Sequence, residues 1–210
     1  MIETPTSHVI ARSSGALSRA PGSYEKRLAD LDGIYANSDA FRSVAQTDGE
    51  RVVYRVEDAR PEVAEGGLIF GTTYMEPGRI DNEFFVTRGH LHARADRPET
   101  YRGESGEGVL LLESPEGETR TLEIAAEVLV YVPPFWVHRS VNTGSDPLVM
   151  SFCYPADAGQ NYDIIDRANG MAARIVAAPH GGWTLVPNIA YQPRSQAEID
   201  AIYAGREVPQ

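Results

Sequence analysis

The stretch VLLLESPEGETRTLEI, residues 109–124, has the form of a β-hairpin. Its first part is a run of apolar residues, the SPEG sequence at 114–117 is rich in turn-forming residues, and its last part alternates polar and apolar side chains. A strand, a turn and an alternating strand in this order favour an antiparallel sheet with one face toward solvent.

Short strands of the same kind lie on both sides of this hairpin. Runs rich in β-branched and aromatic residues recur about every ten residues between 50 and 155, and Gly, Pro and Asn turns separate them. This spacing predicts an all-β protein built as an antiparallel sandwich or barrel. The strands that we expect cover residues 52–56, 67–75, 83–87, 109–113, 120–124, 128–132 and 148–154.

The flanks of this strand-rich part differ in pattern. We expect one domain over residues 1–210, with a barrel core at about 50–155, an N-terminal arm with short helices at 1–49, and a cover segment with a C-terminal helix at 156–210. Within the flanks, the patterns predict an irregular arm at 1–24, short helices at 25–31 and 39–45, a helix or irregular cover at 162–173, a closing strand at 183–186 and an exposed helix at 195–204.

Three histidines and one glutamate form the most specific pattern in the chain. His90 and His92 are two residues apart, a spacing that points both side chains to one face of a strand. Glu99 follows seven residues later, and His138 follows a Pro-Pro strand end. Three imidazoles and a carboxylate suit Fe, Ni, Cu or Zn, and the carboxylate extends the range toward Mn. Four protein ligands leave positions open for water or a substrate, so the pattern predicts a Lewis-acid site.

Charge and the remaining special residues restrict the partners. The chain has 19 Lys and Arg against 30 Asp and Glu, a formal net charge of −11. Such a charge repels nucleic-acid backbones, and no apolar run reaches the ~18 residues of a membrane span, so we expect neither partner. The only cysteine, Cys153, lies in an apolar run, and the N-terminus lacks a signal-peptide pattern, which favours a reduced, cytoplasmic protein. We assign Cys153, His8 and His180 no chemical role.

Several motifs together carry a family resemblance. They are FFVTRGHLHA at 84–93, RPETY at 97–101, YVPPFWVHR at 131–139, VNTG at 141–144 and YPADAG at 154–159. These runs resemble the cupin-type glucose-6-phosphate isomerases, and the likeness extends from about residue 27 to residue 186. The two histidines with the glutamate are common to cupins, whereas the Thr-x-Gly-His-x-His context and the YPADAG run are narrower. The resemblance implies a cupin jelly-roll barrel, interconversion of glucose 6-phosphate and fructose 6-phosphate, and a homodimer.

The resemblance also assigns roles to residues. It implies one divalent metal per subunit, with iron expected first and Mn, Ni or Zn as alternatives, held by His90, His92, Glu99 and His138. Glu99 is in addition the candidate base that moves a proton between C1 and C2 of the sugar, with a hydride shift as the other route. The positions implied to line the phosphosugar pocket are Tyr54, Thr73, Thr87, Gly89, Tyr101, Tyr154, Gln160 and Tyr162, with Arg88 as a further phosphate contact.

One pocket position departs from the family pattern. Gln160 stands where the family often carries a histidine, and its amide forms hydrogen bonds but does not titrate near neutrality. Three alternatives stay open from the sequence: a cupin Fe(II) dioxygenase, an isomerase acting on a different phosphosugar, and a non-catalytic sugar- or metal-binding cupin. The many tyrosines and threonines expected in the pocket favour a phosphosugar over an apolar substrate.

Overall fold

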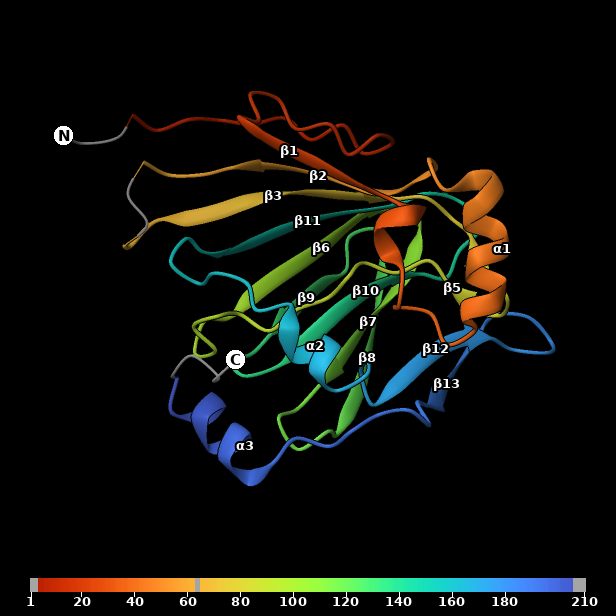
Figure 1. Ribbon diagram of the computed structural model, residues 1–210. Coiled ribbons are helices and arrows are strands. Elements are labelled where there is room, and N and C mark those ends of the chain that lie inside the picture. The colour runs from red at the N-terminus through yellow and green to blue at the C-terminus, as the bar shows by residue number, and fades with distance from the viewer. Residues whose placement is uncertain (1–3, 63–64, 206–210) are drawn as a thin grey trace.

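Antiparallel strands are the dominant secondary structure of the chain (Figure 1). The computed structural model describes residues 4–62 and 65–205. The strands in these ranges are β1 (Gly22–Arg27), β2 (Val52–Ala59), β3 (Leu68–Met75), β4 (Arg79–Ile80), β5 (Glu83–Phe84), β6 (Glu99–Ser105), β7 (Glu107–Glu113), β8 (Thr119–Ala125), β9 (Leu129–Val132), β10 (Val137–Asn142), β11 (Leu148–Pro155), β12 (Ala173–Ala177) and β13 (Trp183–Pro187). The helices there are the 3-10 turn η1 (Leu28–Leu31), α1 (Ser38–Asp48), α2 (Asp163–Arg167) and α3 (Gln196–Tyr203).

The strands form three sheets in the described part of the chain. The largest has the order β1-β2-β3-β11-β6-β9, a second has the order β10-β7-β8, and a third has the order β13-β12-β5-β4. Figure 1 shows the first two as the walls of the barrel, with α1 and α3 at its periphery. Val53, Met75 and Met150 from the large sheet pack in one apolar core with Leu110 and Val141 from the second. The prediction of an all-β antiparallel barrel with short helical appendages is confirmed.

The predicted hairpin at 109–124 is formed by β7 and β8. Its register runs from the Glu107–Ala125 pair to the Glu113–Thr119 pair. The turn closes through the Ser114 amide, which donates to the Glu118 carbonyl at 2.8 Å. Strand β7 is buried after its first residue, whereas β8 is largely exposed, as the two hydrophobicity patterns predict.

The flanks agree with the predictions in part. The structure has a helix, α3, inside the predicted 195–204 range, a short helix, α2, in the predicted cover segment, and the closing strand β13. The predicted helix at 25–31 is wrong: residues up to Arg27 form β1, which pairs with β2, and only the last four turn as η1. Pairing along the open edge of β2 outweighs the weak helical pattern of this polar segment.

Besides β1 and the two-residue β4, three strands are missing from the prediction. β6 and β10 carry charged or polar side chains at buried positions, so they lack the apolar run by which the other strands were identified. β12 lies in the predicted cover segment. The predicted strand at 83–87 shortens to β5, while α1 is longer than the helix predicted at 39–45. Parts of the predicted N-terminal arm and C-terminal flank lie outside the described residues, and the single-domain assignment stays a prediction.

A buried ion pair fastens the C-terminal segment to the hairpin. The Arg194 guanidinium lies 2.6 Å from the Glu113 carboxylate, and their side chains are 4% and 0% exposed. The same carboxylate accepts hydrogen bonds from the Ala172 amide and the Tyr191 hydroxyl.

No helix among the described residues has both the length and the apolar character needed to cross a membrane.

Removal of this carboxylate is expected to destabilise the protein strongly. Glu113→Ala leaves the Arg194 charge buried without its partner, and a loss of that kind costs about 3–5 kcal/mol in the free energy of unfolding. Glu118→Ala is the matched control, because the Glu118–Arg120 pair is exposed and such pairs contribute about 1 kcal/mol or less. Urea unfolding measures both. Equal losses in the two variants would contradict the assignment.

Candidate active site

The four predicted metal ligands come from three segments that the sheets bring together. His138 lies on β10 and Glu99 is the first residue of β6, whereas His90 and His92 lie between β5 and β6. The His90 and His138 backbones pair directly: each amide donates to the other carbonyl, at 3.0 and 2.9 Å. The histidine segment is extended but makes only isolated bridges, so it is not the regular strand that the sequence suggested.

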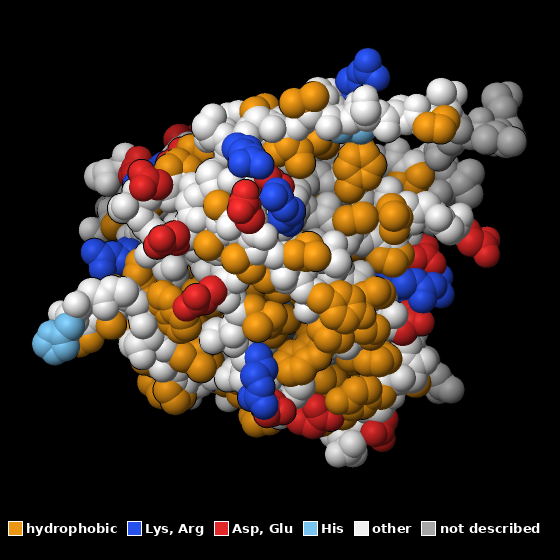
Figure 2. Space-filling view, turned by 180° about the vertical axis from the view of Figure 1, so that it is seen from behind, with side chains coloured by type: hydrophobic (Ala, Val, Ile, Leu, Met, Phe, Trp, Pro, Cys, Tyr) orange, Lys and Arg blue, Asp and Glu red, His pale blue; other side chains and the backbone are white. Residues whose placement is uncertain are grey.

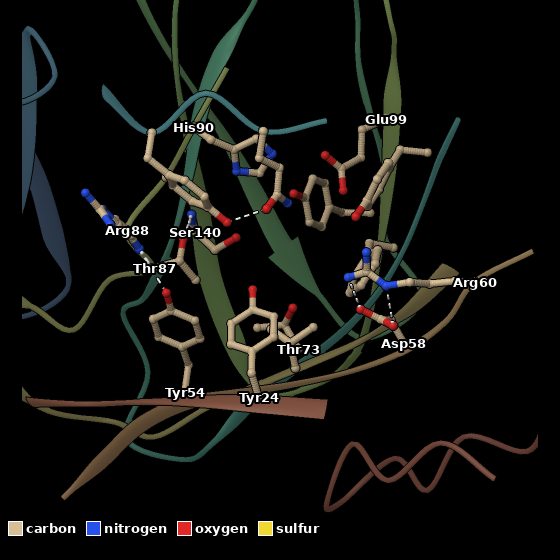
Figure 3. A pocket seen from close by; sticks show the side chains of 17 residues that line it. Tyr24, Tyr54, Asp58, Arg60, Thr73, Thr87, Arg88, His90, Glu99 and Ser140 are labelled. Carbon is tan, nitrogen blue, oxygen red and sulfur yellow. Dashed lines mark hydrogen bonds and ion pairs between the residues drawn. The ribbon is translucent and has the colours of Figure 1, made fainter. Parts of the chain in front are cut away.

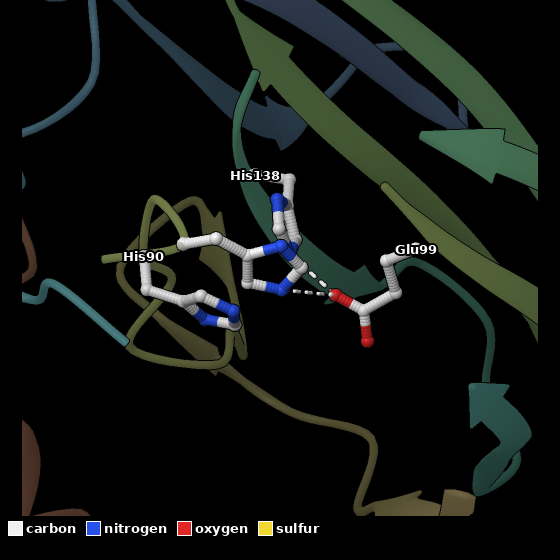
Figure 4. Close-up of side chains that lie close together, drawn as sticks. His90, Glu99 and His138 are labelled. Atoms are coloured by element: carbon white, nitrogen blue, oxygen red, sulfur yellow. Dashed lines mark hydrogen bonds and ion pairs between the residues drawn. The ribbon is translucent and has the colours of Figure 1, made fainter. Parts of the chain in front are cut away.

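The ligand atoms of His90, His92, Glu99 and His138 converge (Figure 4). All four lie within 4.8 Å of one another. Glu99 Oε2 lies 3.0 Å from His138 Nε2 and 3.3 Å from His92 Nε2. The Nδ1 atoms of these two histidines hydrogen-bond to backbone carbonyls, His92 to that of Arg97 and His138 to that of Trp136. Each contact holds its ring with Nε2 toward the cluster, as in metal sites where the other ring nitrogen is fixed by a carbonyl.

The protonation states of the cluster suit a divalent cation. Burial and the neighbouring His138 lower the pKa of His90 well below its usual value, so the imidazole is neutral. Burial opposes ionisation of Glu99, but the hydrogen bond with His138 and the proximity of His92 outweigh it and hold the pKa of Glu99 below its usual range. The Nε2 atoms of His90 and His92 are buried and have no hydrogen-bond partner. A metal ion would satisfy both nitrogens, so the residues fit the predicted group.

A cavity opens beside this cluster (Figure 3). Its lining includes Glu99 and His90, whereas His92 and His138 lie behind it. The eight residues expected to contact a substrate all line it: Tyr54, Thr73, Thr87, Gly89, Tyr101, Tyr154, Gln160 and Tyr162.

Other lining residues were missed by the sequence argument. They are Tyr24, Val56, Asp58, Arg60, Ser140 and Phe152, whereas Arg88, which was expected as a phosphate contact, also lines the cavity. Most of them lie two or four positions from a predicted site residue on the same strand, and this period of two points both side chains to the same face. The examples are residues 54, 56 and 58 on β2, 138 and 140 on β10, and 152 and 154 on β11. That period is the signal that could have identified them. Tyr24 lies on β1, at a position that was predicted to belong to the irregular arm.

Neutral hydroxyl and amide groups dominate the cavity. Burial raises the pKa of Tyr54 to about 12 and raises the pKa of Tyr154 further, so both phenols stay protonated and can donate hydrogen bonds. The Thr87 hydroxyl accepts from the Ser140 amide at 3.0 Å. Gly89 has φ +75, and a Cβ there would lie 2.9 Å from the His138 carbonyl, so only glycine fits between the loop and β10.

Two charged groups lie at the edge of the cavity. Arg60 pairs with the buried Asp58 through two hydrogen bonds, at 3.0 and 2.8 Å. Arg88 pairs with Asp166 at 2.7 Å and covers the Tyr162 ring at 5.1 Å. Both guanidinium groups are therefore already paired with carboxylates.

Comparison with known proteins places the chain. A family model described as glucose-6-phosphate isomerase (GPI) matches residues 25–194. The chain belongs to the glucose-6-phosphate isomerase family. It is similar to the glucose-6-phosphate isomerase of Sinorhizobium medicae, 52% identical over 90% of this chain and 89% of that protein. The glucose-6-phosphate isomerase of Thermococcus litoralis is 44% identical over 67% of this chain and 73% of that protein.

Solved structures resemble only part of this family member. An oxalate oxidase has a TM-score of 0.44 at 16% identity, covering 51% of this chain and 54% of that chain. The oxalate decarboxylase of Bacillus subtilis, described with Mn(II) centres, has a TM-score of 0.41 at 23% identity, covering 50% of this chain and 26% of that chain.

A divalent cation is expected to stabilise the folded protein through this cluster. A ligand present at 1,000 times its dissociation constant adds about 4 kcal/mol to the free energy of unfolding. Differential scanning calorimetry of metal-free protein titrated with Mn(II) or Zn(II) measures the rise in melting temperature. His138→Gln should abolish the rise, whereas His180→Gln, at an exposed histidine outside the cluster, should keep it. The same rise in both variants would place the ion elsewhere.

Proposed function

We propose that this chain is a metal-dependent isomerase that interconverts glucose 6-phosphate and fructose 6-phosphate. One observation carries the proposal: the His90, His92, Glu99 and His138 cluster opens onto a cavity of neutral hydroxyl donors. Membership of the glucose-6-phosphate isomerase family supplies the substrate class. Neutral donors in a buried pocket can hold a phosphate dianion despite the net charge of −11.

The proposed cofactor is one divalent metal ion per subunit, held by His90, His92, Glu99 and His138. Iron is the ion that we propose first, and Mn, Ni and Zn suit the same nitrogen and oxygen donors. When bound, the ion supplies Lewis acidity, which lowers the energy of negative charge on the sugar oxygens.

Glu99 is the proposed base. Its Oε2 atom faces His138 and His92, which leaves Oε1 for proton transfer. In the aldose-to-ketose direction Oε1 takes the proton from C2 and returns it to C1, while the hydroxyl proton of O2 passes to O1. The lowered pKa keeps Glu99 ionised but makes it a weaker base, so a hydride shift from C2 to C1 is the competing route.

The phosphate is proposed to bind at the opposite side of the cavity from Glu99. Thr73, Thr87 and the Gly89 amide offer neutral donors there, and Arg88 adds a cation if it leaves Asp166. The Tyr54 hydroxyl accepts a hydrogen bond from the Arg88 amide at 3.4 Å, and this contact helps to fix the position of the loop. The remaining tyrosines, 101, 154 and 162, are proposed to contact the sugar.

The cavity must widen before a sugar phosphate can enter. Its volume is about 70 Å³, whereas ligand pockets usually measure about 300–1,000 Å³. Gln160 and Tyr162 are hydrogen-bonded to each other on the segment after β11, outside the large sheet. We propose that this pair moves aside, because most other walls are strands and the segment at 87–90 is held to β10 by backbone hydrogen bonds.

Isomerase activity should depend on both the metal and Glu99. Chelator-treated protein should lose conversion of fructose 6-phosphate, and reloading with Fe(II), Mn(II), Ni(II) or Zn(II) should restore it. Glu99→Gln should lower kcat by about 10²–10⁴-fold, the contribution typical of general acid–base catalysis. Glu123→Gln, at an exposed carboxylate on β8, is the control. Oxygen consumption with Fe(II) and no isomerisation would contradict the proposal.

Exchange with solvent separates the two routes. Proton transfer through Glu99 should place deuterium from D₂O at C1 of the fructose 6-phosphate formed, as read by NMR of the product. Complete retention of the substrate hydrogen would contradict the Glu99 base and support the hydride shift.

The threonine contacts should act on binding. Thr73→Val removes a buried hydroxyl at nearly constant volume, so KM for fructose 6-phosphate should rise by about tenfold with a smaller change in kcat. Thr47→Val on the exposed side of α1 should leave KM unchanged. A fall in kcat with an unchanged KM would contradict a role of Thr73 in phosphate binding and would indicate a role in the chemical step.

A homodimer is proposed from exposed apolar side chains. Leu129 and Tyr131 alternate outward along β9, the edge of the large sheet, and are 68% and 56% exposed. Figure 2 shows many hydrophobic side chains on the face turned away in Figure 1. Apolar surface of this kind marks contact sites between subunits. The cytoplasmic location expected from the sequence also stays a proposal.

Sedimentation velocity tests the subunit contact. The wild-type protein should sediment as a dimer, and Leu129→Glu should shift it toward a monomer, because the new carboxylate would be buried unpaired in the interface. Leu185→Glu on β13 is the control at another exposed leucine. A wild-type monomer at micromolar concentration would refute the dimer.

A further inference from the structure

A second cavity lies on the other side of Arg88. Its volume is about 700 Å³, and it is bounded by the turn after η1, by α2, by β12 and by the segment after β13. Figure 1 shows η1 and α2 on the same side of the barrel. Arg88 lines both cavities, and apart from Arg88 the second one holds none of the proposed metal or substrate contacts. Its size matches that of a small-molecule site.

Arg139 is the unusual residue in this cavity. Its side chain lines the wall although the residue is only 7% exposed. Nε and one terminal nitrogen donate to the Arg88 carbonyl, at 3.3 and 2.6 Å. Within residues 4–62 and 65–205, Arg139 makes no ion pair, so its charge is met by a single carbonyl dipole. A buried charge without a counter-charge is costly unless a ligand supplies one.

The surroundings of Arg139 increase this imbalance. Arg174 lies close enough to repel it, and the one carboxylate between them, Glu83, is already 2.8 Å from an Arg174 nitrogen. The two guanidinium groups therefore share one carboxylate, so this wall of the cavity carries one positive charge in excess. Among the acidic lining residues, Asp166 pairs with Arg88, and Asp30 and Asp32 are exposed. Two further donors are buried without a hydrogen-bond partner: Arg174 Nε and the Tyr35 hydroxyl. Both belong to residues that line the cavity.

The donors and the rim select a ligand class. Three separate donor groups, Arg139, Arg174 Nε and Tyr35, match the several acceptor oxygens of a phosphate better than the two of a carboxylate. The rim carries the exposed Asp32 and Asn169, whose oxygens accept hydrogen bonds from hydroxyl groups. A bare anion would gain nothing from Asp32, whereas a hydroxylated ligand would.

We propose that this cavity binds a hydroxyl-bearing phosphate monoester, with its phosphate on Arg139 and Tyr35 and its hydroxyls at the Asp32 rim. The site is separate from the cavity next to the metal cluster. Because Arg139 holds the carbonyl of Arg88, whose side chain lines both cavities, the two sites share a wall. The binding claim does not depend on the proposed isomerase activity.

Calorimetric titration of metal-loaded protein with glycerol 3-phosphate tests the site. If the catalytic cavity also binds the probe, two sites per chain are expected in the wild type and one in Arg139→Gln. If the catalytic cavity does not, one site is expected in the wild type and none in the variant. Either result supports the second site, and the wild-type count reports separately on the proposed function. Arg42→Gln, at an exposed arginine on α1, should behave as the wild type.

Affinity supplies the quantitative test. Arg139→Gln should weaken the second site by at least about tenfold, the effect of losing a charged hydrogen bond. Unchanged stoichiometry and affinity in a folded Arg139→Gln would overturn the proposal. If that variant does not fold, as judged by circular dichroism, Tyr35→Phe decides: about fivefold weaker binding is expected, and unchanged binding would overturn it.

A second titration tests the hydroxyl part. Inorganic phosphate carries the same anion without the alcohol groups, so it should bind the Arg139-dependent site about tenfold more weakly than glycerol 3-phosphate. Asp32→Ala should remove this difference while leaving phosphate binding intact. Equal affinity of both probes in the wild type would overturn the assignment of a monoester.

Discussion

The backbone pairing of His90 with His138 is the contact on which the rest of the site depends. Two reciprocal hydrogen bonds place ligands that are 48 positions apart in the sequence on adjoining chain segments. The close approach also requires Gly89, because a side chain there would strike the His138 carbonyl. Two further residues complete the cluster beside this pair. Glu99 is the first residue of β6, and His92 follows His90 after one extended residue. The main-chain hydrogen bonds therefore determine where the side chains of the site lie.

Charge within the site follows from the same arrangement. Burial and the nearby His138 keep the His90 imidazole neutral, and the contacts of Glu99 with His138 and His92 keep that carboxylate ionised. The neighbouring cavity is lined by tyrosines that stay protonated for the same reason, namely burial. An acidic protein can in this way offer mostly neutral donors to an anionic substrate, because the Arg60 and Arg88 charges at the edge of the cavity are paired with carboxylates.

The sequence was most informative where a pattern is local. The 109–124 hairpin could be predicted because its turn and its two hydrophobicity patterns are contiguous, and the histidine spacing identified the cluster. β6 and β10 were missed because they bury polar residues, and those residues are the ones that the site uses. Tyr24 was missed for another reason: its strand exists only because β2 offers an edge. The Arg139 cavity is a tertiary arrangement of distant segments, and no local pattern indicates it.

The strand order limits when the barrel can form during synthesis. β11 lies between β3 and β6 in the large sheet, so the two earlier strands have no common neighbour until the chain has been made as far as Pro155. The large sheet can therefore be completed only late in synthesis, when β11 joins the pairs that its earlier strands form. The buried carboxylate of Glu113 gains its ion-pair partner later still, when Arg194 has been made.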